Sequence, residues 1–250
     1  MKRESLLDHS SVQANKNIKA RKYWENRLKE LKLQRYFDVS SKAVPVSSII
    51  EEYTISFDTE ITEKLSKFGT SEQAKHLILL GAVGVLANKY SQLNDLILFT
   101  TNYQQEKRSQ ILPVRLSGFE DTSFKELLGN LKNNFIQDLK YASYPTLRLL
   151  TDDLNTKAKR YATSVTLTEI QGEVSNEMLI EDLQFCFSCK NSLSLKLKYN
   201  SLFFSQTEIS TIAKQFSVLL EKLLSNLETP LHQITLLSES EQVFLLEGFN

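Results

Sequence analysis

Apolar and polar residues repeat along the chain with two periods, one typical of strands and one typical of helices. Several long segments have apolar residues three and four positions apart, whereas several short segments alternate or are continuously apolar. The helical pattern covers residues 17–33, 58–69, 70–91, 121–143, 144–154 and 205–224. The strand pattern covers residues 51–58, 95–102, 111–118, 161–170, 182–189 and 192–200. We therefore expect about six helices and six strands in mixed order.

Three pairs of residues have the spacing of a capping box, in which the first side chain and the one three positions later each bind the other's backbone N–H. The pairs are Thr70–Gln73, Ser205–Glu208 and Ser238–Glu241. Asp58 or Thr59 is a further candidate for a helix start, and Gly69 is suited to end that helix. The sequence thus predicts where four helices begin.

The apolar pattern also predicts where some elements lie in the fold. The helix over 70–91 is apolar on most sides, which is typical of a helix in the middle of a fold. The continuous apolar run of 95–102 indicates a central strand, while Pro113 indicates that the strand over 111–118 lies at an edge or begins there. Successive strands near the C-terminus disfavour a purely parallel sheet. We expect an α/β sandwich, with one mixed sheet and helices packed chiefly on one face.

The closing stretch, PLHQITLLSESEQVFLLEGFN, predicts a short strand and then the start of an amphipathic helix. Phe244, Leu245 and Phe249 need a surface to pack against, yet the sequence stops at Asn250. Either the chain was cut here or this segment joins something else.

Charge narrows the range of partners. The 250 residues include 30 Lys and Arg and 30 Asp and Glu, so the formal net charge is zero. This balance gives no general reason to expect nucleic acid or an anionic membrane as a partner. The N-terminus lacks the apolar core of a signal peptide, and no window approaches the roughly 18 apolar residues of a membrane span. We therefore expect a cytoplasmic protein.

Cys186 and Cys189 form a C-x-x-C pattern. A redox pair of this kind normally begins a helix, where the dipole lowers the pKa of a thiol. Here both residues lie in a predicted strand, where positions three apart point to opposite faces. No further zinc ligands lie nearby at suitable spacing. We expect two structural cysteines, one buried and one semi-exposed.

Other residues with acid–base chemistry are scattered. The histidines are His9 in the polar tail, His76 near a helix start and His232 in the closing stretch, and none has a local ligand or triad partner. For His76 we expect a half-exposed structural role. Asp152 and Asp153 are adjacent at a helix end and point to different sides, so we expect them to be solvated or to end the helix. Glycine-rich phosphate loops and the G-x-S-x-G motif are absent. We assign no catalytic, cofactor-binding or metal-binding residue.

Five short motifs follow one another along the chain. They are Y-W-x-x-x-L at Tyr23, Trp24 and Leu28; P-x-R followed by F-x-x-L-L at Pro113, Arg115, Phe124, Leu127 and Leu128; Y-P at Tyr144 and Pro145; Y-N-x-x-F at Tyr199, Asn200 and Phe203; and a closing segment with Glu241 and Asn250. Together, over residues 20–250, they resemble the second half of the condensation domains of nonribosomal peptide synthetases. The resemblance implies a single lobe of the chloramphenicol-acetyltransferase fold.

The same resemblance draws attention to what this sequence lacks. The H-H-x-x-x-D-G motif, whose second histidine is usually assigned a catalytic role in the family, belongs to the first lobe, and no two histidines are adjacent here. The segment 100–115 lacks the family's G-x-F-V-N-T and is short, and 167–184 also looks shortened. In full condensation domains, both segments reach toward the first lobe, which is missing here. We therefore expect a half that was reshaped to stand alone, with Met1 as its native start.

On this basis we divide the chain into a flexible tail over 1–16, a condensation-like C-terminal lobe over 17–237 and an exit segment over 238–250. The resemblance implies a non-catalytic, truncated condensation-like domain, a structural or docking module at the N-terminus of an initiation or adenylation module. Its expected partners are the adjacent adenylation domain and a carrier protein or docking partner, with no cofactor, nucleic acid or membrane. Two alternatives are half of a split condensation enzyme whose catalytic lobe another chain supplies, and a divergent acyltransferase with His76 as base.

Overall fold

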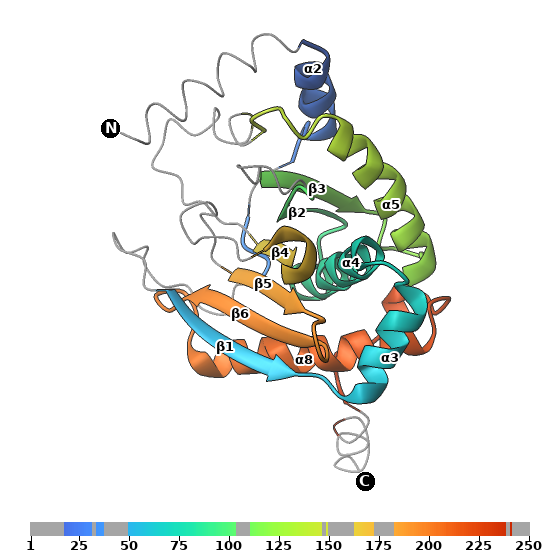
Figure 1. The fold of residues 1–250 in the computed structure, drawn as a ribbon, viewed down its shortest axis with the longest axis vertical. Coiled ribbons are helices and arrows are strands. Elements are labelled where there is room, and N and C mark those ends of the chain that lie inside the picture. Colours follow the sequence, from blue (N-terminus) through green and yellow to red (C-terminus); the bar gives the residue numbers. More distant parts are fainter. Residues whose placement is uncertain are drawn as a thin grey trace.

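The computed structural model describes residues 18–31, 34–37, 50–103, 111–146, 149, 163–172, 183–238 and 241. Its elements follow in the order α2 (Ile18–Arg27), β1 (Ile50–Ser56), α3 (Thr59–Phe68), α4 (Glu72–Ser91), β2 (Asp95–Thr101), β3 (Ile111–Ser117), α5 (Phe124–Lys140), β4 (Thr163–Leu167), α7 (Thr168–Gln171), β5 (Leu183–Ser188), β6 (Ser194–Asn200), α8 (Gln206–Ser225) and the 3₁₀ turn η1 (Leu231–Gln233). Figure 1 shows how these elements are arranged.

The described strands form a single six-stranded sheet in the order β1-β6-β5-β4-β2-β3. β2, β4 and β5 run parallel to one another, while β1 and β6, β5 and β6, and β2 and β3 pair antiparallel. This mixed pairing confirms the predicted fold class. β3 lies at an edge, where the missing N–H of Pro113 costs no internal ladder bond, and β2 lies inside the sheet.

The joint between β2 and β4 is narrow. These two strands share a single register pair, Phe99 with Ser164. Nearer the start of β2, the hydroxyl of Tyr36 takes the place of a neighbouring strand: it accepts from Ile97 N at 2.8 Å and donates to Ile97 O at 3.0 Å. A single side chain therefore satisfies backbone groups that the short β4 does not reach.

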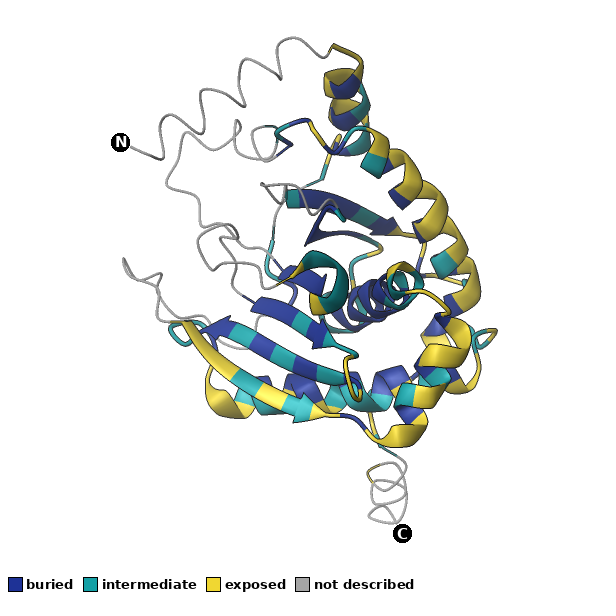
Figure 2. Ribbon diagram, viewed as in Figure 1, coloured by how far each residue is buried: buried dark blue, intermediate teal, exposed yellow. Residues whose placement is uncertain are grey.

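Helices cover one face of the sheet, and the core lies between the two layers. Phe185 and Phe187 of β5 point to this face and pack against Phe216 of α8. α4 contacts β2 and β4, α5 contacts β3, and α8 contacts β1 and β6. Figure 2 shows buried residues concentrated where the sheet and these helices meet. The arrangement is the predicted α/β sandwich. None of the helices in the described part of the chain is both long and apolar enough to cross a membrane.

α4 is the central helix, as its apolar sequence predicts. A Cβ atom at Gly81 would lie 2.9 Å from Leu128 of α5, and one at Gly84 would lie 2.7 Å from Leu116 of β3. Glycine therefore allows α5 and the sheet to approach the helix backbone more closely than any other residue would permit.

The opposite face of the sheet is polar across four of its strands. Ser164, Gln184, Lys198 and Glu52 are successive partners across β4, β5, β6 and β1, so their side chains lie in one row. The ammonium of Lys198 lies 3.6 Å from the Glu52 carboxylate, and that of Lys196 lies 3.2 Å from it. On β2 the same face is apolar, because the buried Phe99 is the register partner of Ser164.

Helix caps test the predicted helix starts directly. The Ser205–Glu208 capping box is confirmed, with the Glu208 carboxylate accepting from Ser205 N at 2.7 Å. The Thr70–Gln73 box is wrong. Ser71 is the N-cap of α4, and its hydroxyl accepts the backbone N–H three residues later at 3.2 Å. The helix begins one residue later than the spacing suggested.

Two further predictions need correction. The strand expected over 161–170 ends at Leu167 and gives way to α7. The short strand expected after Pro230 is a single bridge from that residue to Ser123, followed by the 3₁₀ turn η1. The predicted tail over 1–16 and most of the helix over 144–154 lie outside the described residues.

Candidate functional site

Polar side chains gather near the carboxyl ends of the parallel strands β2 and β4. His76 lies in the second turn of α4 and reaches the end of these strands. Its Nδ1 is 2.8 Å from the Tyr103 hydroxyl, and its Nε2 is 3.0 Å from the Thr100 hydroxyl and 3.5 Å from the carbonyl of Val165. Both ring nitrogens therefore have hydrogen-bonding partners.

His76 is also completely buried, with 0 % of its surface exposed. The rings of Tyr103 and Phe135 pack beside the imidazole, with centroids 5.5 and 6.2 Å away. Burial lowers the pKa of His76 to about 4, so the ring is neutral at neutral pH. The prediction that His76 is half-exposed is thus wrong, because the rings of Tyr103 and of Phe135 on α5 cover the imidazole.

Gln171 extends this network into α7. Its Nε2 donates to the Thr100 hydroxyl at 2.8 Å and to the Thr101 carbonyl at 2.6 Å, while its Oε1 accepts from Leu167 N at 2.7 Å. The side chain therefore links β2, β4 and α7. Gln171 was not singled out from the sequence, because the pattern extended a strand across most of α7. These contacts hold elements together and leave no atom of His76 facing an accessible space.

The remaining candidates are not brought to this network. His232 lies in η1, exposed, with Nδ1 3.9 Å from the Asp121 carboxylate. His9, Asp152 and Asp153 lie outside the described residues. The structure therefore places one described histidine in the core and the other on the surface.

The two cysteines are not joined in a disulfide, and both are half-buried, which corrects the expectation of one buried and one semi-exposed residue. Cys186 lies in β5, and Cys189 lies just beyond its end. Burial, reinforced by the nearby Glu169 carboxylate, raises the pKa of Cys189 to about 12, so it is a thiol and a weak nucleophile. Among the described residues, no three His, Cys, Asp or Glu side chains are placed to hold a metal ion.

The Y-W motif has a structural role at the junction of α2 and α5. Asp138 of α5 has no exposed surface, accepts a hydrogen bond from the Tyr23 hydroxyl and lies 3.2 Å from Nε of Arg27. Trp24 Nε1 donates to the carbonyl of Tyr141 at 2.9 Å. Burial raises the pKa of Asp138, and the Arg27 charge and the Tyr23 hydrogen bond oppose that shift. The motif thus fastens α2 to the body of the domain.

Arg115, in the second motif, extends this junction to the sheet edge. Its guanidinium donates to the Asp95 carboxylate at 2.9 Å through Nε, and to the Arg27 carbonyl at 3.1 Å. In return, Arg27 Nη2 donates to the carbonyl of Arg115 at 3.2 Å. Arg115 therefore joins α2, β2 and β3 and is not directed into a cavity as a free cation.

The stretch just before the predicted exit segment is held against α8 by one lysine. Lys222 Nζ donates to the carbonyl and hydroxyl of Thr235, both at 3.1 Å, and to the carbonyl of Leu237 at 2.6 Å. The predicted Ser238–Glu241 capping box comes directly after these contacts, with Ser238 N donating to the Glu241 carboxylate at 2.8 Å. Phe244, Leu245 and Phe249 lie outside the described residues.

Comparison with known proteins identifies the fold and its relatives. The family model of the condensation domain matches residues 7–246. Bacitracin synthase 1 of Bacillus licheniformis is 26% identical over 231 residues, covering 78% of this chain and 4% of the synthase. Tyrocidine synthase 3 of Brevibacillus parabrevis is 26% identical over 204 residues, covering 70% of this chain and 3% of that protein.

Solved structures agree on the fold. The X-domain from teicoplanin biosynthesis has a TM-score of 0.74 at 14% identity, with 94% of this chain and 61% of that chain covered. The starter condensation domain of rhizomide synthetase has a TM-score of 0.73 at 14% identity, covering 92% of this chain and 57% of that one. The chain thus spans under a tenth of the curated relatives and somewhat more than half of these solved chains. With its family match and its fold in agreement, this chain belongs to the condensation domain family.

Proposed function

We propose that this chain is a non-catalytic, condensation-like lobe of a nonribosomal peptide synthetase, and that it serves as a structural or docking module beside an adenylation domain. The observation that carries the proposal is the enclosure of His76. Amide formation by general base catalysis needs a base within hydrogen-bond reach of the attacking group. His76 has both ring nitrogens engaged and no exposed surface, so it does not meet that requirement.

Other described groups support the same view. His232 is exposed, and the Asp121 carboxylate 3.9 Å from its Nδ1 is exposed as well. The thiol of Cys189 is protonated at neutral pH. The enclosure of His76 also counts against a single-lobe acyltransferase that uses this histidine as its base.

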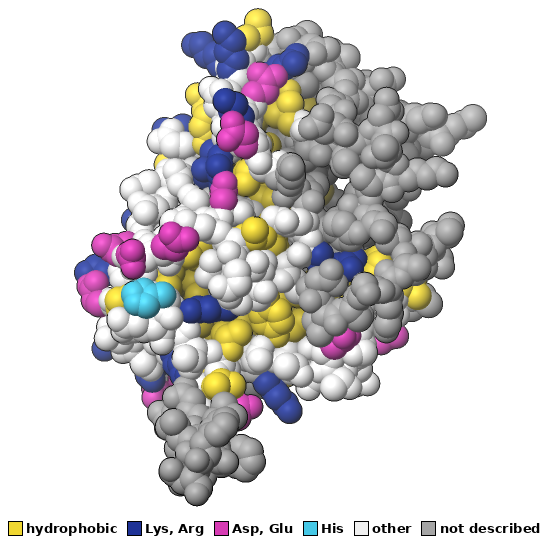
Figure 3. Space-filling view, turned by 180° about the vertical axis from the view of Figure 1, so that it is seen from behind, with side chains coloured by type: hydrophobic (Ala, Val, Ile, Leu, Met, Phe, Trp, Pro, Cys, Tyr) yellow, Lys and Arg dark blue, Asp and Glu magenta, His cyan; other side chains and the backbone are white. Residues whose placement is uncertain are grey.

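A docking role has support from the surface and from relatives. Figure 3 shows apolar side chains among mixed charges near the middle of the face behind the sheet, and exposed apolar surface is a common feature of contact sites. The X-domain from teicoplanin biosynthesis, which shares this fold, has been solved in complex with OxyB. A four-domain nonribosomal peptide synthetase bound to AMP and glycine also contains the fold, with a TM-score of 0.74.

The first test is an assay of amide formation with donor and acceptor substrates loaded on carrier proteins. We expect no product above background from the purified chain, and the same result for His76→Gln. Product formed by the chain alone would contradict the proposal. Product that requires a second chain with the H-H-x-x-x-D-G motif would also contradict it and would establish the split-enzyme alternative.

The second test removes residues 1–235 from the polypeptide that contains this chain. We expect a lower rate of amino acid adenylation, lower solubility or loss of a bound partner, because the neighbouring domain loses its support. If all three properties matched those of the intact protein, the chain would have no structural or docking role there.

A further inference from the structure

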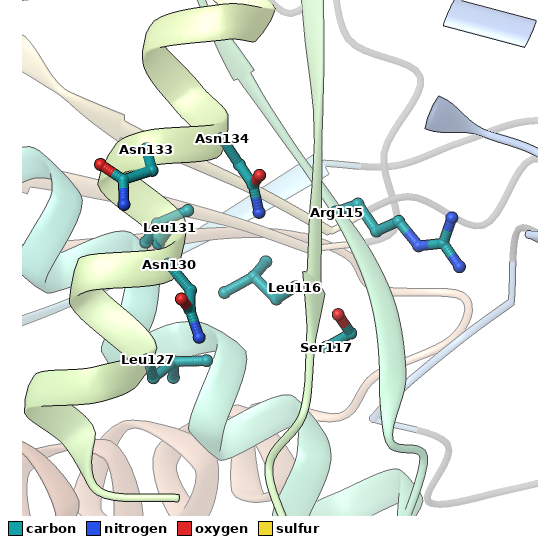
Figure 4. A pocket seen from close by; sticks show the side chains of 8 residues that line it. All are labelled: Arg115, Leu116, Ser117, Leu127, Asn130, Leu131, Asn133 and Asn134. Atoms are coloured by element: carbon teal, nitrogen blue, oxygen red, sulfur yellow. The ribbon is translucent and has the colours of Figure 1, made fainter. Parts of the chain in front are cut away.

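A surface hollow lies between the end of the edge strand β3 and the middle of α5. Its volume is about 350 Å³. Leu116 of β3 and Leu127 and Leu131 of α5 lie beneath it and are themselves buried. Figure 4 shows Asn130 and Asn134 extending from α5 toward β3, while Asn133, also in the lining, points away from the strand. The hollow therefore combines a strand edge with a mainly polar lining of asparagine carboxamides.

The edge of β3 offers backbone groups only near its end. The carbonyls of Ile111 and Arg115 accept from Thr146 and Arg27, which lie outside β2, so these two residues direct their backbone groups away from the sheet. Because this direction alternates along an antiparallel strand, Pro113 and Ser117 face outward as well. Pro113 has no N–H to offer. In the second half of the strand, the backbone N–H groups of Arg115 and Ser117 and the carbonyls of Pro113 and Ser117 are the outward groups that no described hydrogen bond uses.

The asparagines are placed to bind a peptide backbone. Asn130 and Asn134 are four residues apart, so they lie on the same side of α5, and both are exposed. Each carboxamide can donate and accept, as a peptide group does. No hydrogen bond among the described residues uses either side chain. Asparagine is a weak helix former, so α5 gains little stability from having it at these positions.

The lining is also electrically neutral. Of the residues around the hollow, Arg115 alone carries a charge; Figure 4 shows its side chain on the far side of the strand, where it binds Asp95. The hollow thus gives no advantage to a charged ligand.

We propose that this hollow binds a short, extended and uncharged segment of a partner polypeptide. The segment continues the sheet beyond the end of β3, pairs with the backbone of Arg115 and Ser117, and has its peptide groups held by Asn130 and Asn134. Addition of a strand to an exposed sheet edge is a recurrent mode of peptide recognition. This proposal gives the docking role above a surface and a partner chemistry, and it rests on that role.

The test uses a blocked pentapeptide, acetyl-Ser-Val-Thr-Val-Ser-amide, titrated into the isotope-labelled chain and followed by NMR. We expect shifts at the backbone amides of Arg115 and Ser117 and at the side-chain amides of Asn130 and Asn134. The double variant Asn130→Ala/Asn134→Ala should bind about tenfold more weakly or worse, since two hydrogen-bonding groups are lost. Lys132→Ala, on the same helix but outside the lining of the hollow, is the matched control and should bind normally.

A second control is the same peptide N-methylated at alternate residues, which removes the N–H groups that would pair with the strand. It should not bind. Shifts elsewhere, equal binding of the methylated peptide, or equal binding by the double variant would overturn the proposal. So would self-association of the chain that depends on Asn130 and Asn134, because a second copy would then be the occupant. These outcomes do not depend on the amide-formation assay. The peptide site can therefore be disproved while the non-catalytic role stands, and the non-catalytic role can be disproved while the peptide site stands.

Discussion

His76 shows how a histidine can be a structural residue with a marked effect on stability. Its pKa in the folded protein, about 4, lies below the 6.5 of an unperturbed side chain. Between pH 4 and pH 6.5, the unfolded chain therefore binds more protons than the folded protein does. The stability of the fold is fully present above about pH 6.5 and falls as the pH is lowered toward 4.

We expect the protonation of His76 to lower the free energy of unfolding by on the order of 3 kcal/mol between pH 7 and pH 4. This figure follows from the difference between the two pKa values. Urea denaturation across that range measures the effect. His76→Gln should flatten the pH dependence, although its stability at pH 7 will be lower because the network loses a partner. A profile that is equally steep in His76→Gln would contradict the assignment.

The cap of α4 gives a second single-residue prediction. Ser71→Ala should lower the free energy of unfolding by about 1 kcal/mol, because the hydroxyl no longer accepts an N–H of the first turn. Thr70→Ala should change it by less than about 0.5 kcal/mol, since Thr70 is exposed and is not the cap. Equilibrium denaturation of both variants measures the difference, and the reverse order would mean that the helix starts at the residue predicted from spacing.

These residues also show what the sequence can and cannot predict. The Ser205–Glu208 and Ser238–Glu241 boxes are local, so their spacing was sufficient to locate them. The burial of His76 depends on Tyr103, Phe135 and Gln171, which are distant along the chain and have no pattern linking them to it. The candidate hollow was missed for the same reason, because it arises where β3 meets α5.

Among the elements, α2 is attached through a polar junction and through the buried side chain of Trp24. Asp138→Ala would leave the Arg27 guanidinium and the Tyr23 hydroxyl without their buried partner. We expect a loss of about 2–3 kcal/mol, with faster hydrogen exchange in α2. Glu25→Ala removes a solvent-exposed ion pair with Arg21 and should cost less than about 1 kcal/mol. If exchange in α2 were the same in both variants, the junction would not be what holds the helix.

The strands illustrate a different limit of prediction. Alternation and continuous apolar runs located all six of them, and Pro113 indicated that β3 lies at an edge or begins there. The boundary between β4 and α7 was missed because the predicted strand was extended to Ile170, although Glu169 breaks the alternation of Val165 and Leu167. The pairing of β4 with β5 ends at Leu167. The order of strands in the sheet is set by contacts between distant segments, which a single sequence does not reveal.

In the molecule as a whole, Lys222 determines how the chain leaves the domain. Its three hydrogen bonds fix the segment just before the Ser238–Glu241 cap, so the direction of the capped turn is set relative to α8. Lys222→Met should make residues 234–238 at least about tenfold more sensitive to limited proteolysis, while the core remains folded. Thr211→Ala, at an exposed position of α8 whose hydroxyl bonds within the helix, should leave cleavage unchanged. Equal cleavage of the two variants would show that Lys222 does not hold this stretch.

The narrow joint between β2 and β4 has a consequence for how the protein folds. The β2–β3 hairpin joins neighbouring parts of the chain, whereas β1 and β6 come from distant ones, so the hairpin can form early and the rest of the sheet closes more slowly. Among the described residues, the two parts are connected by one register pair and by the side chain of Gln171, which bonds β2 and the end of β4. Gln171 lies in α7, far from β2 in sequence. The last step of folding is therefore expected to be the closure of this joint.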